Sequence, residues 1–155
     1  MHLERIDKSY HRSIIDIAKK LRTRDEKTGW FMDGAIHDMI PIDVNIQRGY
    51  IAEEKGEVLG FITYLSEYGR PKIGWMGVDP EHHREGIGRA LLERVEEDIK
   101  EIGGKEIYVE TPTKDEGKGT DYESTYKFYE SKGFELHKIL EDEQCDMGLL
   151  RKDLV

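Results

Sequence analysis

A run of small and basic residues near the middle of the chain has the composition of an anion-binding turn. It stands directly before a long amphipathic segment and reads His83-Arg84-Glu85-Gly86-Ile87-Gly88-Arg89. A glycine-rich turn at the start of a helix leaves backbone N–H groups unpaired at the positive end of the helix dipole, which favours phosphate binding. A plain turn that begins a helix has the same pattern, because short glycine motifs recur without any ligand. Both readings are open from these residues alone.

The elements on either side must position this turn. Residues 72–78 predict a strand that ends at Val78, after which Asp79-Pro80 turns the chain. Downstream, apolar side chains recur every four residues and predict a helix over residues 86–102, the recurring positions being Ile87, Leu91, Val95 and Ile99. A strand, a glycine turn and a helix therefore follow one another directly.

This stretch resembles the signature of the GCN5-related N-acetyltransferase (GNAT) family. In that family V-x-P is followed by polar residues and then by Q/R-x-x-G-x-G/A at the start of a long helix; here Val78-Asp79-Pro80 precedes His83-Arg84-Glu85-Gly86-Ile87-Gly88. Nearer the C-terminus, a second segment is similar to the family's F-Y-x-x-x-G-F, and it reads Tyr126-Lys127-Phe128-Tyr129-Glu130-Ser131-Lys132-Gly133-Phe134. The two motifs stand in the family's order and imply its fold; residues 22–48 are the part that the resemblance covers least.

The resemblance implies acetyl-CoA as the acyl donor. Its pyrophosphate would lie on backbone amides of residues 84–89, and the strand before the turn would pair with its pantetheine arm and polarise the acetyl carbonyl. The residues expected to contact acetyl-CoA are Met76, Gly77, Val78, His83, Arg84, Glu85, Gly86, Ile87, Gly88, Arg89 and Tyr122.

Two residues are the catalytic candidates. Tyr129 matches the family tyrosine that commonly protonates the leaving thiolate, and a phenol with a pKa of about 10 suits that step. An amine acceptor must also lose a proton, and Glu110, at the end of an alternating segment, is the first candidate for the base. From the residues alone, Tyr129 could instead only pack its helix, and Glu110 could be a solvated carboxylate. Glu67, Asp79, Tyr64 and a chain of water molecules are further candidates for the base.

The chain departs from the family pattern at three places. His83 stands where Gln or Arg is usual, although an imidazole can still donate a hydrogen bond. Tyr122 stands seven residues before Tyr129, where the family often has an asparagine that contacts pantetheine. The polar segment 112–121 is longer than is usual and could be a lid over the acceptor or a surface loop.

Other residue clusters carry less chemistry. Trp30, Phe31 and Met32 could line an acceptor pocket or cover the core, and the acidic residues around them could attract a cationic amine or be solvated. A metal site is not expected, because the adjacent His82 and His83 have no second ligand cluster. Cys145, the one cysteine, lies in no motif and is expected to be a small buried side chain.

The order of elements predicts one α/β domain, residues 1–155, with a mixed and mostly antiparallel central sheet. The predicted order is β-α-α-β-β-β-α-β-α-β-β. Strands are expected over residues 2–6, 50–54, 58–65, 72–78, 106–111, 134–140 and 147–150. Helices are expected from about Asp7 to Leu21 and over residues 35–47, 86–102 and 122–132. The Asp7 carboxylate would cap the first of these helices. Residues 22–34 and 112–120 are expected to be loops.

Composition excludes several classes of function. The chain has 155 residues with 24 Lys and Arg against 33 Asp and Glu, and this net charge of −9 argues against nucleic-acid binding. A single cysteine excludes an internal disulfide and fits a reducing compartment. No apolar stretch approaches 18 residues, so no membrane span is expected. These features predict a soluble cytoplasmic protein, and they leave a homodimer open as its assembly.

The resemblance implies an N-acetyltransferase that moves the acetyl group of acetyl-CoA to a primary amine by direct attack in a ternary complex. The acceptor could be a small molecule or a peptide or protein amine, and the surplus of carboxylates favours a cationic one. The alternative is a non-catalytic acyl-CoA-binding sensor or regulatory module. A third reading is an unrelated binder of nucleotide phosphates, which ATP but not CoA would stabilise.

Overall fold

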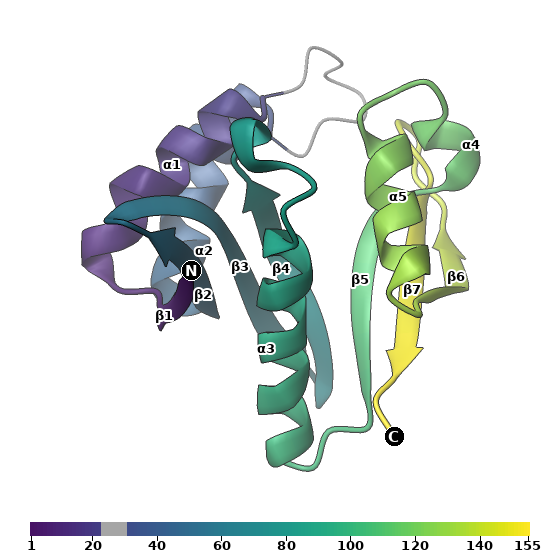
Figure 1. Ribbon diagram of the computed structural model, residues 1–155. Coiled ribbons are helices and arrows are strands. Elements are labelled where there is room, and N and C mark those ends of the chain that lie inside the picture. Colours follow the sequence, from purple (N-terminus) through teal and green to yellow (C-terminus); the bar gives the residue numbers. More distant parts are fainter. Residues whose placement is uncertain (23–30) are drawn as a thin grey trace.

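The computed structural model describes residues 1–22 and 31–155, which form a seven-stranded mixed sheet with helices on both faces (Figure 1). The strands are β1 (His2–Arg5), β2 (Arg48–Glu54), β3 (Glu57–Glu67), β4 (Arg70–Val78), β5 (Glu106–Pro112), β6 (Glu135–Leu140) and β7 (Met147–Asp153). The helices are α1 (His11–Lys20), α2 (Ile40–Ile46), α3 (Ile87–Glu101), α4 (Lys114–Gly117) and α5 (Tyr122–Ser131). Short 3-10 turns lie at Lys8–Tyr10 and Pro80–His82, and a π-helical turn at Ala35–Met39 leads into α2.

The sheet consists of two parts that meet at one parallel pair of strands. Its order is β1-β2-β3-β4-β5-β7-β6, and every neighbouring pair is antiparallel except β4 and β5. The expected antiparallel strands β2, β3 and β4 are thus confirmed. β4 and β5 are in register only where Lys72 lies opposite Tyr108, near the start of β4, and the rest of β4 is not paired with β5. The sheet therefore opens between these strands, toward the end of β4 that leads into the glycine turn.

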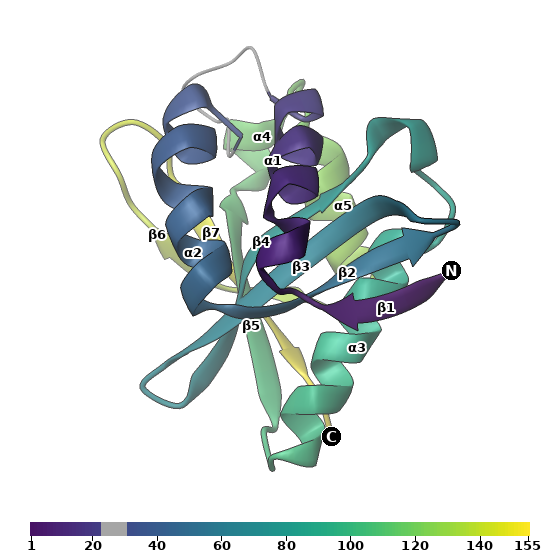
Figure 2. The ribbon, with the colours of Figure 1, turned by 90° about the vertical axis from the view of Figure 1, so that its left-hand side faces the viewer.

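Each face of the sheet has its own hydrophobic core, because successive strand residues point to opposite faces. Phe61 of β3 is fully buried against α1 and α2, whereas the next residue, Ile62, is fully buried in the core formed with α3 and α5. Figure 2 shows α1 and α2 together on one face. The apolar stripe predicted for α3 is confirmed, since Leu91, Val95 and Ile99 are all buried in the second core. The long helix is thereby fixed against the sheet, and its first turn lies next to the end of β4.

Three details differ from the expectations. The Asp7 carboxylate accepts from the Ser9 amide at 2.8 Å and caps the 3-10 turn that precedes α1, rather than α1 itself. The expected loop over residues 112–120 contains α4, because the Thr113 hydroxyl accepts from the Glu116 amide and starts a helical turn. β7 continues to Asp153 because its polar end pairs with β5, where Asp153 lies opposite Glu106. The loop expected over residues 22–34 lies largely outside the described residues. Within the described ranges, no helix is long and apolar enough to cross a membrane.

Candidate active site

The glycine turn leaves the first turn of α3 open to a ligand. Gly86 is the residue before the helix and has φ +81°, a left-handed conformation that glycine adopts without strain. A Cβ at Gly86 would meet no atom within 4 Å, and no side chain of the described residues caps the helix. The Ile87 side chain is buried in the core, so this residue can offer only its backbone to a ligand. These unpaired N–H groups lie where the sequence analysis expected an anion to bind, and no described side chain covers them.

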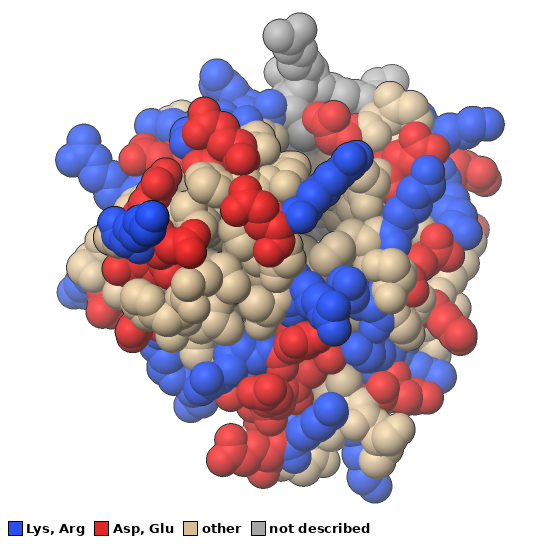
Figure 3. Space-filling model, in the orientation of Figure 1, with Lys and Arg blue, Asp and Glu red and all other residues tan. Residues whose placement is uncertain are grey.

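Positively charged side chains lie near the start of α3, and negatively charged side chains lie further along it. Arg84, in the turn, and Arg89, on the first turn of α3, are both exposed, and the Arg89 guanidinium also pairs with Glu93 at 2.8 Å. In Figure 3, Lys and Arg side chains gather near the middle of the face shown, with Asp and Glu side chains above them and others further down, over the rest of α3. The start of the helix is therefore the part of this face that favours an anion.

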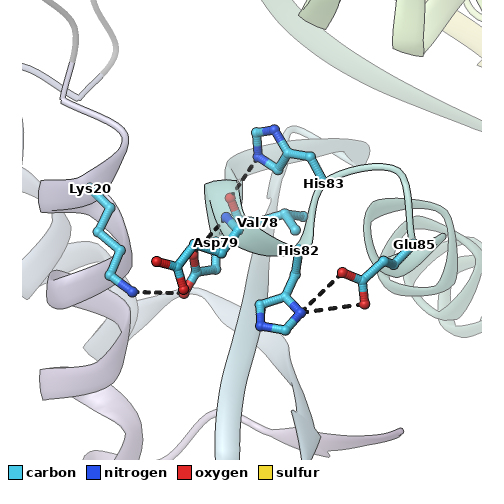
Figure 4. A network of polar contacts seen from close by, with 7 residues as sticks. Lys20, Val78, Asp79, His82, His83 and Glu85 are labelled. Carbon is cyan, nitrogen blue, oxygen red and sulfur yellow. Dashed lines mark hydrogen bonds and ion pairs between the residues drawn. The ribbon is translucent and has the colours of Figure 1, made fainter.

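Short-range polar contacts hold the turn in its shape (Figure 4). Asp79, which is 2% exposed, accepts from Lys20 of α1 at 2.8 Å and from the Glu81 amide at 3.0 Å. Burial alone would raise the pKa of the Asp79 carboxyl, but these hydrogen bonds outweigh it and lower that pKa. His82 lies 3.1 Å from Glu85, and this contact raises the pKa of the imidazole. The turn is thus tied to α1 and to itself.

His83 makes a different contact from the one that its motif position implies. Its Nε2 lies 2.9 Å from the carbonyl oxygen of Val78 (Figure 4). A carbonyl oxygen only accepts, so Nε2 must carry the proton and donate it. The imidazole therefore joins the turn to the last residue of β4.

The end of β4 exposes one edge of its backbone to the opening in the sheet. The Asp79 amide donates to the carbonyl of Leu59 at 2.8 Å, and Gly77 lies opposite Phe61, so these backbone groups face β3. Backbone groups of successive strand residues point to alternate edges. Those of Met76 and Val78 therefore face the other way, into the gap between β4 and β5. This is the edge expected to pair with a ligand arm, and its Val78 carbonyl accepts from His83.

Tyr129 lies on α5, beside the start of α3. Its ring is 3% exposed and packs edge-on against Phe128 and Phe134, with ring centroids 5.3 Å apart in both pairs. A Cβ at Gly88 would lie 3.4 Å from the Phe128 ring, so the first turn of α3 and α5 are in close contact. No residue of the described ranges hydrogen-bonds to the Tyr129 hydroxyl, and burial raises the pKa of this phenol. The side chain is therefore a protonated phenol at neutral pH.

A small cavity of about 70 Å³ joins the predicted catalytic residues. Tyr129, Glu110 and Met76 all line it, and so does Tyr122, which is buried on α5. The complete lining is Phe31, Ile73, Gly74, Trp75, Met76, Val109, Glu110, Tyr122, Thr125 and Tyr129. The structure thus brings together residues that are far apart in the chain, between the diverging strands and under α5.

Glu110 has a partner that the sequence did not reveal. Its Oε1 accepts from the Lys72 ammonium at 2.6 Å, and Lys72 also bonds to Glu67 at 3.0 Å. Lys72 sits where β4 and β5 pair, a register that no local pattern in the sequence indicates. The other candidates for the base have their own partners. Asp79 is bonded to Lys20, and the Tyr64 hydroxyl donates to Asp98 at 2.9 Å.

The remaining candidates divide between the cavity and other places. Phe31 lines the cavity, whereas Trp30 lies outside the described residues. Cys145 is buried, and burial together with a hydrogen bond to Glu116 raises the pKa of its thiol to about 11. No group of three or more metal-ligating side chains occurs in the part of the chain that the structure describes.

Comparison with known proteins gives the family context of this arrangement. Residues 45–136 match the family model described as "Acetyltransferase (GNAT) domain". The S-(2-succino)cysteine N-acetyltransferase of Bacillus subtilis (strain 168) is 30% identical over 104 residues, which cover 63% of this chain and 60% of the length of that relative.

Solved structures show the same fold. A GNAT-family protein from Desulfovibrio desulfuricans superposes with a TM-score of 0.79 at 20% identity, covering 99% of each chain. An aminoglycoside 6'-N-acetyltransferase complexed with coenzyme A superposes with a TM-score of 0.75 at 17% identity, covering 100% of this chain and 98% of that one. The mixed α/β fold expected from the sequence is confirmed.

Proposed function

The chain belongs to the GNAT acetyltransferase family, whose members use acetyl-CoA, and we propose that it transfers the acetyl group of acetyl-CoA to a primary amine. One observation carries the proposal furthest: the uncapped start of α3, the open edge of β4 and the Tyr129 side chain lie next to one another. The N-acetyltransferase activity of the relative from Bacillus subtilis and the coenzyme A complex of a structural neighbour support it.

The residues of the turn fit the donor that this function needs. Bound acetyl-CoA supplies an acetyl group activated as a thioester. The backbone amides of residues 84–89 would hold its pyrophosphate, with Gly86 leaving room for close approach. The backbone of Met76 to Val78 would hold the pantetheine arm and direct the acetyl group toward the cavity. His83 keeps the end of this edge in place through its hydrogen bond to Val78.

Tyr129 is the proposed general acid. Its burial keeps the phenol protonated, and Tyr129 lines the cavity in which we propose that the thiolate leaves. A phenol is a weak acid and burial weakens it further, so Tyr129 would give up its proton only to the negative charge that builds on sulfur as the carbon–sulfur bond breaks.

Glu110 is the proposed base for the acceptor. A primary amine is protonated at neutral pH and must lose a proton before its nitrogen can attack. Glu110 accepts that proton, the nitrogen forms the new bond to the acetyl carbon as the carbon–sulfur bond breaks, and Tyr129 gives a proton to sulfur. Over the whole reaction the amine nitrogen loses two protons. One is equivalent to the proton that the sulfur of CoA gains from Tyr129, and the other passes to solvent. Direct attack of this kind needs no covalent enzyme intermediate.

Two measurements on the wild-type chain test this function. Thermal stability should rise with CoA and not with ATP alone, and acetyl-CoA should release free thiol only when an amine is present. Stabilisation by CoA without thiol release across a broad amine panel would favour the non-catalytic acyl-CoA sensor. Stabilisation by ATP and not by CoA would reject both readings.

A further inference from the structure

Strand β4 carries one extra residue where it passes the candidate active site. In its register with β3, the single residue Thr63 of β3 faces two residues of β4, Gly74 and Trp75. Such a β-bulge bends a strand and increases its twist. β4 pairs with β5 only at Lys72, shortly before the bulge. The bulge therefore lies where the sheet opens.

The residues of this bulge form part of the wall of the cavity beside Tyr129. Gly74, Trp75 and their neighbours in β4 line it, as does Glu110 of β5. The shape of the bulge therefore sets where the next residue, Met76, presents its backbone to a ligand arm. A misplacement of about 1 Å at a reacting group can lower a rate about 100-fold. The proposed reaction thus requires that the bulge keep one shape.

A buried hydroxyl holds the bulge. Thr63 Oγ1 accepts from the backbone N–H of Trp75 at 2.8 Å and donates to Gln47 Oε1 at 2.7 Å. Because a backbone amide can only donate, the hydroxyl accepts there and has its own proton left for the glutamine oxygen. Thr63 is fully buried, and a buried amide that loses its acceptor is costly. We call this arrangement of Trp75, Thr63 and Gln47 the Thr63 hydrogen-bond chain.

Gly74 leaves the space in which this hydrogen-bond chain lies. A Cβ at Gly74 would collide with Gln47 Oε1 and would lie 2.7 Å from Thr63 Oγ1. Two polar side chains from other elements thus occupy the position that a side chain of β4 would take. The vacant position and the hydrogen bonds are separate observations, and both bring Thr63 and Gln47 to the bulge.

The end of α2 also holds Trp75 by a second route. Asp43, in the last turn of α2, accepts from the indole Nε1 at 2.7 Å. Gln47 directly follows α2, and its backbone amide donates to the Asp43 carbonyl at 2.7 Å. One helical turn therefore fixes the Trp75 indole directly and the Trp75 backbone through Thr63.

We propose that Thr63 and Gln47 are positioning residues for acetyl transfer, because they hold the bulge of β4 through the Trp75 amide. The inference rests on the proposed function and adds two residues that no motif in the sequence indicates. Neither side chain lines the cavity, so both act on the reaction only through the backbone of β4.

A second buried threonine provides the matched control. Thr111 is as fully buried as Thr63, but its hydroxyl makes no hydrogen bond within the described ranges. Valine nearly keeps the shape of threonine and removes the hydroxyl. With acetyl-CoA and the amine that wild type turns over fastest, Thr63→Val should lower kcat by about 10- to 100-fold. Thr111→Val should leave kcat within about twofold of wild type.

Binding of CoA should not follow this loss of kcat. The glycine turn that would hold the pyrophosphate has no contact with the Thr63 hydrogen-bond chain among the hydrogen bonds described above. Calorimetric titration with CoA should therefore give a Kd for Thr63→Val within about twofold of wild type. A lower kcat with an unchanged Kd indicates a misplaced reacting group rather than a damaged binding site.

Serine in place of Thr63 separates positioning from folding. Thr63→Ser keeps the hydroxyl and removes a buried methyl group, so it should lower Tm by about 2–4 °C. Its kcat, measured below the Tm of each protein, should stay within about threefold of wild type. If Thr63 acted only through stability, kcat would follow Tm in both variants.

Replacement of Gln47 tests the other end of the hydrogen-bond chain. Gln47→Met removes the acceptor of the Thr63 hydroxyl and should lower kcat by about 3- to 10-fold. In the Thr63→Val background the same change should alter kcat by less than about twofold, because the hydrogen-bond chain is already broken. Gln47→Met also decides the question if Thr63→Val does not fold.

Hydrogen exchange of the Trp75 amide, followed by NMR, examines the bulge without turnover. Relative to the other amides of β4, this amide should exchange at least about tenfold faster in Thr63→Val than in wild type. In Thr111→Val it should exchange within about twofold of the wild-type rate.

The outcomes separate this inference from the function on which it rests. Equal kcat for Thr63→Val and Thr111→Val overturns the positioning role and leaves acetyl transfer standing. An unchanged kcat in Gln47→Met, equal losses in Thr63→Ser and Thr63→Val, or an unchanged exchange rate of the Trp75 amide in Thr63→Val does the same. Absence of thiol release by wild type with every amine overturns acetyl transfer, and the positioning role with it.

Discussion

Replacement of Gly86 by alanine separates the backbone geometry of the turn from its contact with a ligand. Gly86 has φ +81°, and a Cβ there would meet no protein atom within 4 Å, so the structural cost is backbone strain alone. For an L-residue in this conformation the strain is about 1–2 kcal/mol. Gly69, in the turn between β3 and β4, has the same φ and the same empty surroundings, so Gly69→Ala is a matched control. In a protein of this size, both variants should lower Tm by about 2–8 °C.

The two variants should differ in their affinity for CoA. The Cβ of Gly86→Ala would stand at the open start of α3, where the pyrophosphate must approach the amides. Loss of one hydrogen bond to a charged phosphate corresponds to about 1.5–3 kcal/mol, or about 10- to 150-fold in Kd. Gly69→Ala should bind CoA as the wild type does. Calorimetric titration of the three proteins with CoA, below the Tm of each, measures the difference. Equal affinities for Gly86→Ala and Gly69→Ala would refute the placement of the pyrophosphate at this turn.

Three further variants test other parts of the account. Tyr129→Phe keeps the ring packing and removes the hydroxyl; steady-state kinetics should show kcat lower by about 100-fold while the Kd of CoA changes by less than about twofold, and an unchanged kcat would exclude the general acid. Asp79→Asn should lower the free energy of unfolding by about 1–3 kcal/mol at pH 7. Because the folded state lowers the pKa of Asp79, this contribution to stability is complete above about pH 4 and is lost as pH falls below it. In urea unfolding, the free energies of unfolding of wild type and Asp79→Asn should therefore converge in acid. Lys152→Met leaves the buried Glu96 carboxylate without its ammonium partner at 2.8 Å and should cost about 3–5 kcal/mol, whereas adding Glu96→Leu should restore part of that loss in the same assay. A double variant as unstable as Lys152→Met would show that the unpaired charge is not the cause.

The sequence predicted the elements well where one local rule dominates. The apolar side chains that recur every four residues, together with the glycine turn before them, predicted a helix that begins soon after a strand ends. The structure has this helix, α3, and this strand, β4. The part of β7 beyond Leu150 was missed because Arg151 to Asp153 are polar. Their backbone pairs with β5, and such pairing leaves no hydrophobic pattern in the sequence.

The motifs indicated which residues belong to the candidate site, but they did not indicate its long-range pairings. Val78 and Gly86 lie where the family pattern places them, and Tyr129 and Glu110 line one cavity. The bond between Glu110 and Lys72 depends on the parallel register of β4 and β5, which only the folded sheet determines. The hydrogen bond of His83 to Val78 likewise depends on the path of the turn rather than on the motif.

The central claim, acetyl transfer from acetyl-CoA to an amine, is tested most directly by quantifying both products of one reaction. Wild-type protein should convert acetyl-CoA and a primary amine into equal amounts of free CoA thiol and N-acetylated amine, the thiol measured by colorimetry and the amide by mass spectrometry. The same reaction with Tyr129→Phe should yield both products about 100-fold more slowly. Tight binding of CoA with neither product above the spontaneous background, for any primary amine offered, would contradict the account.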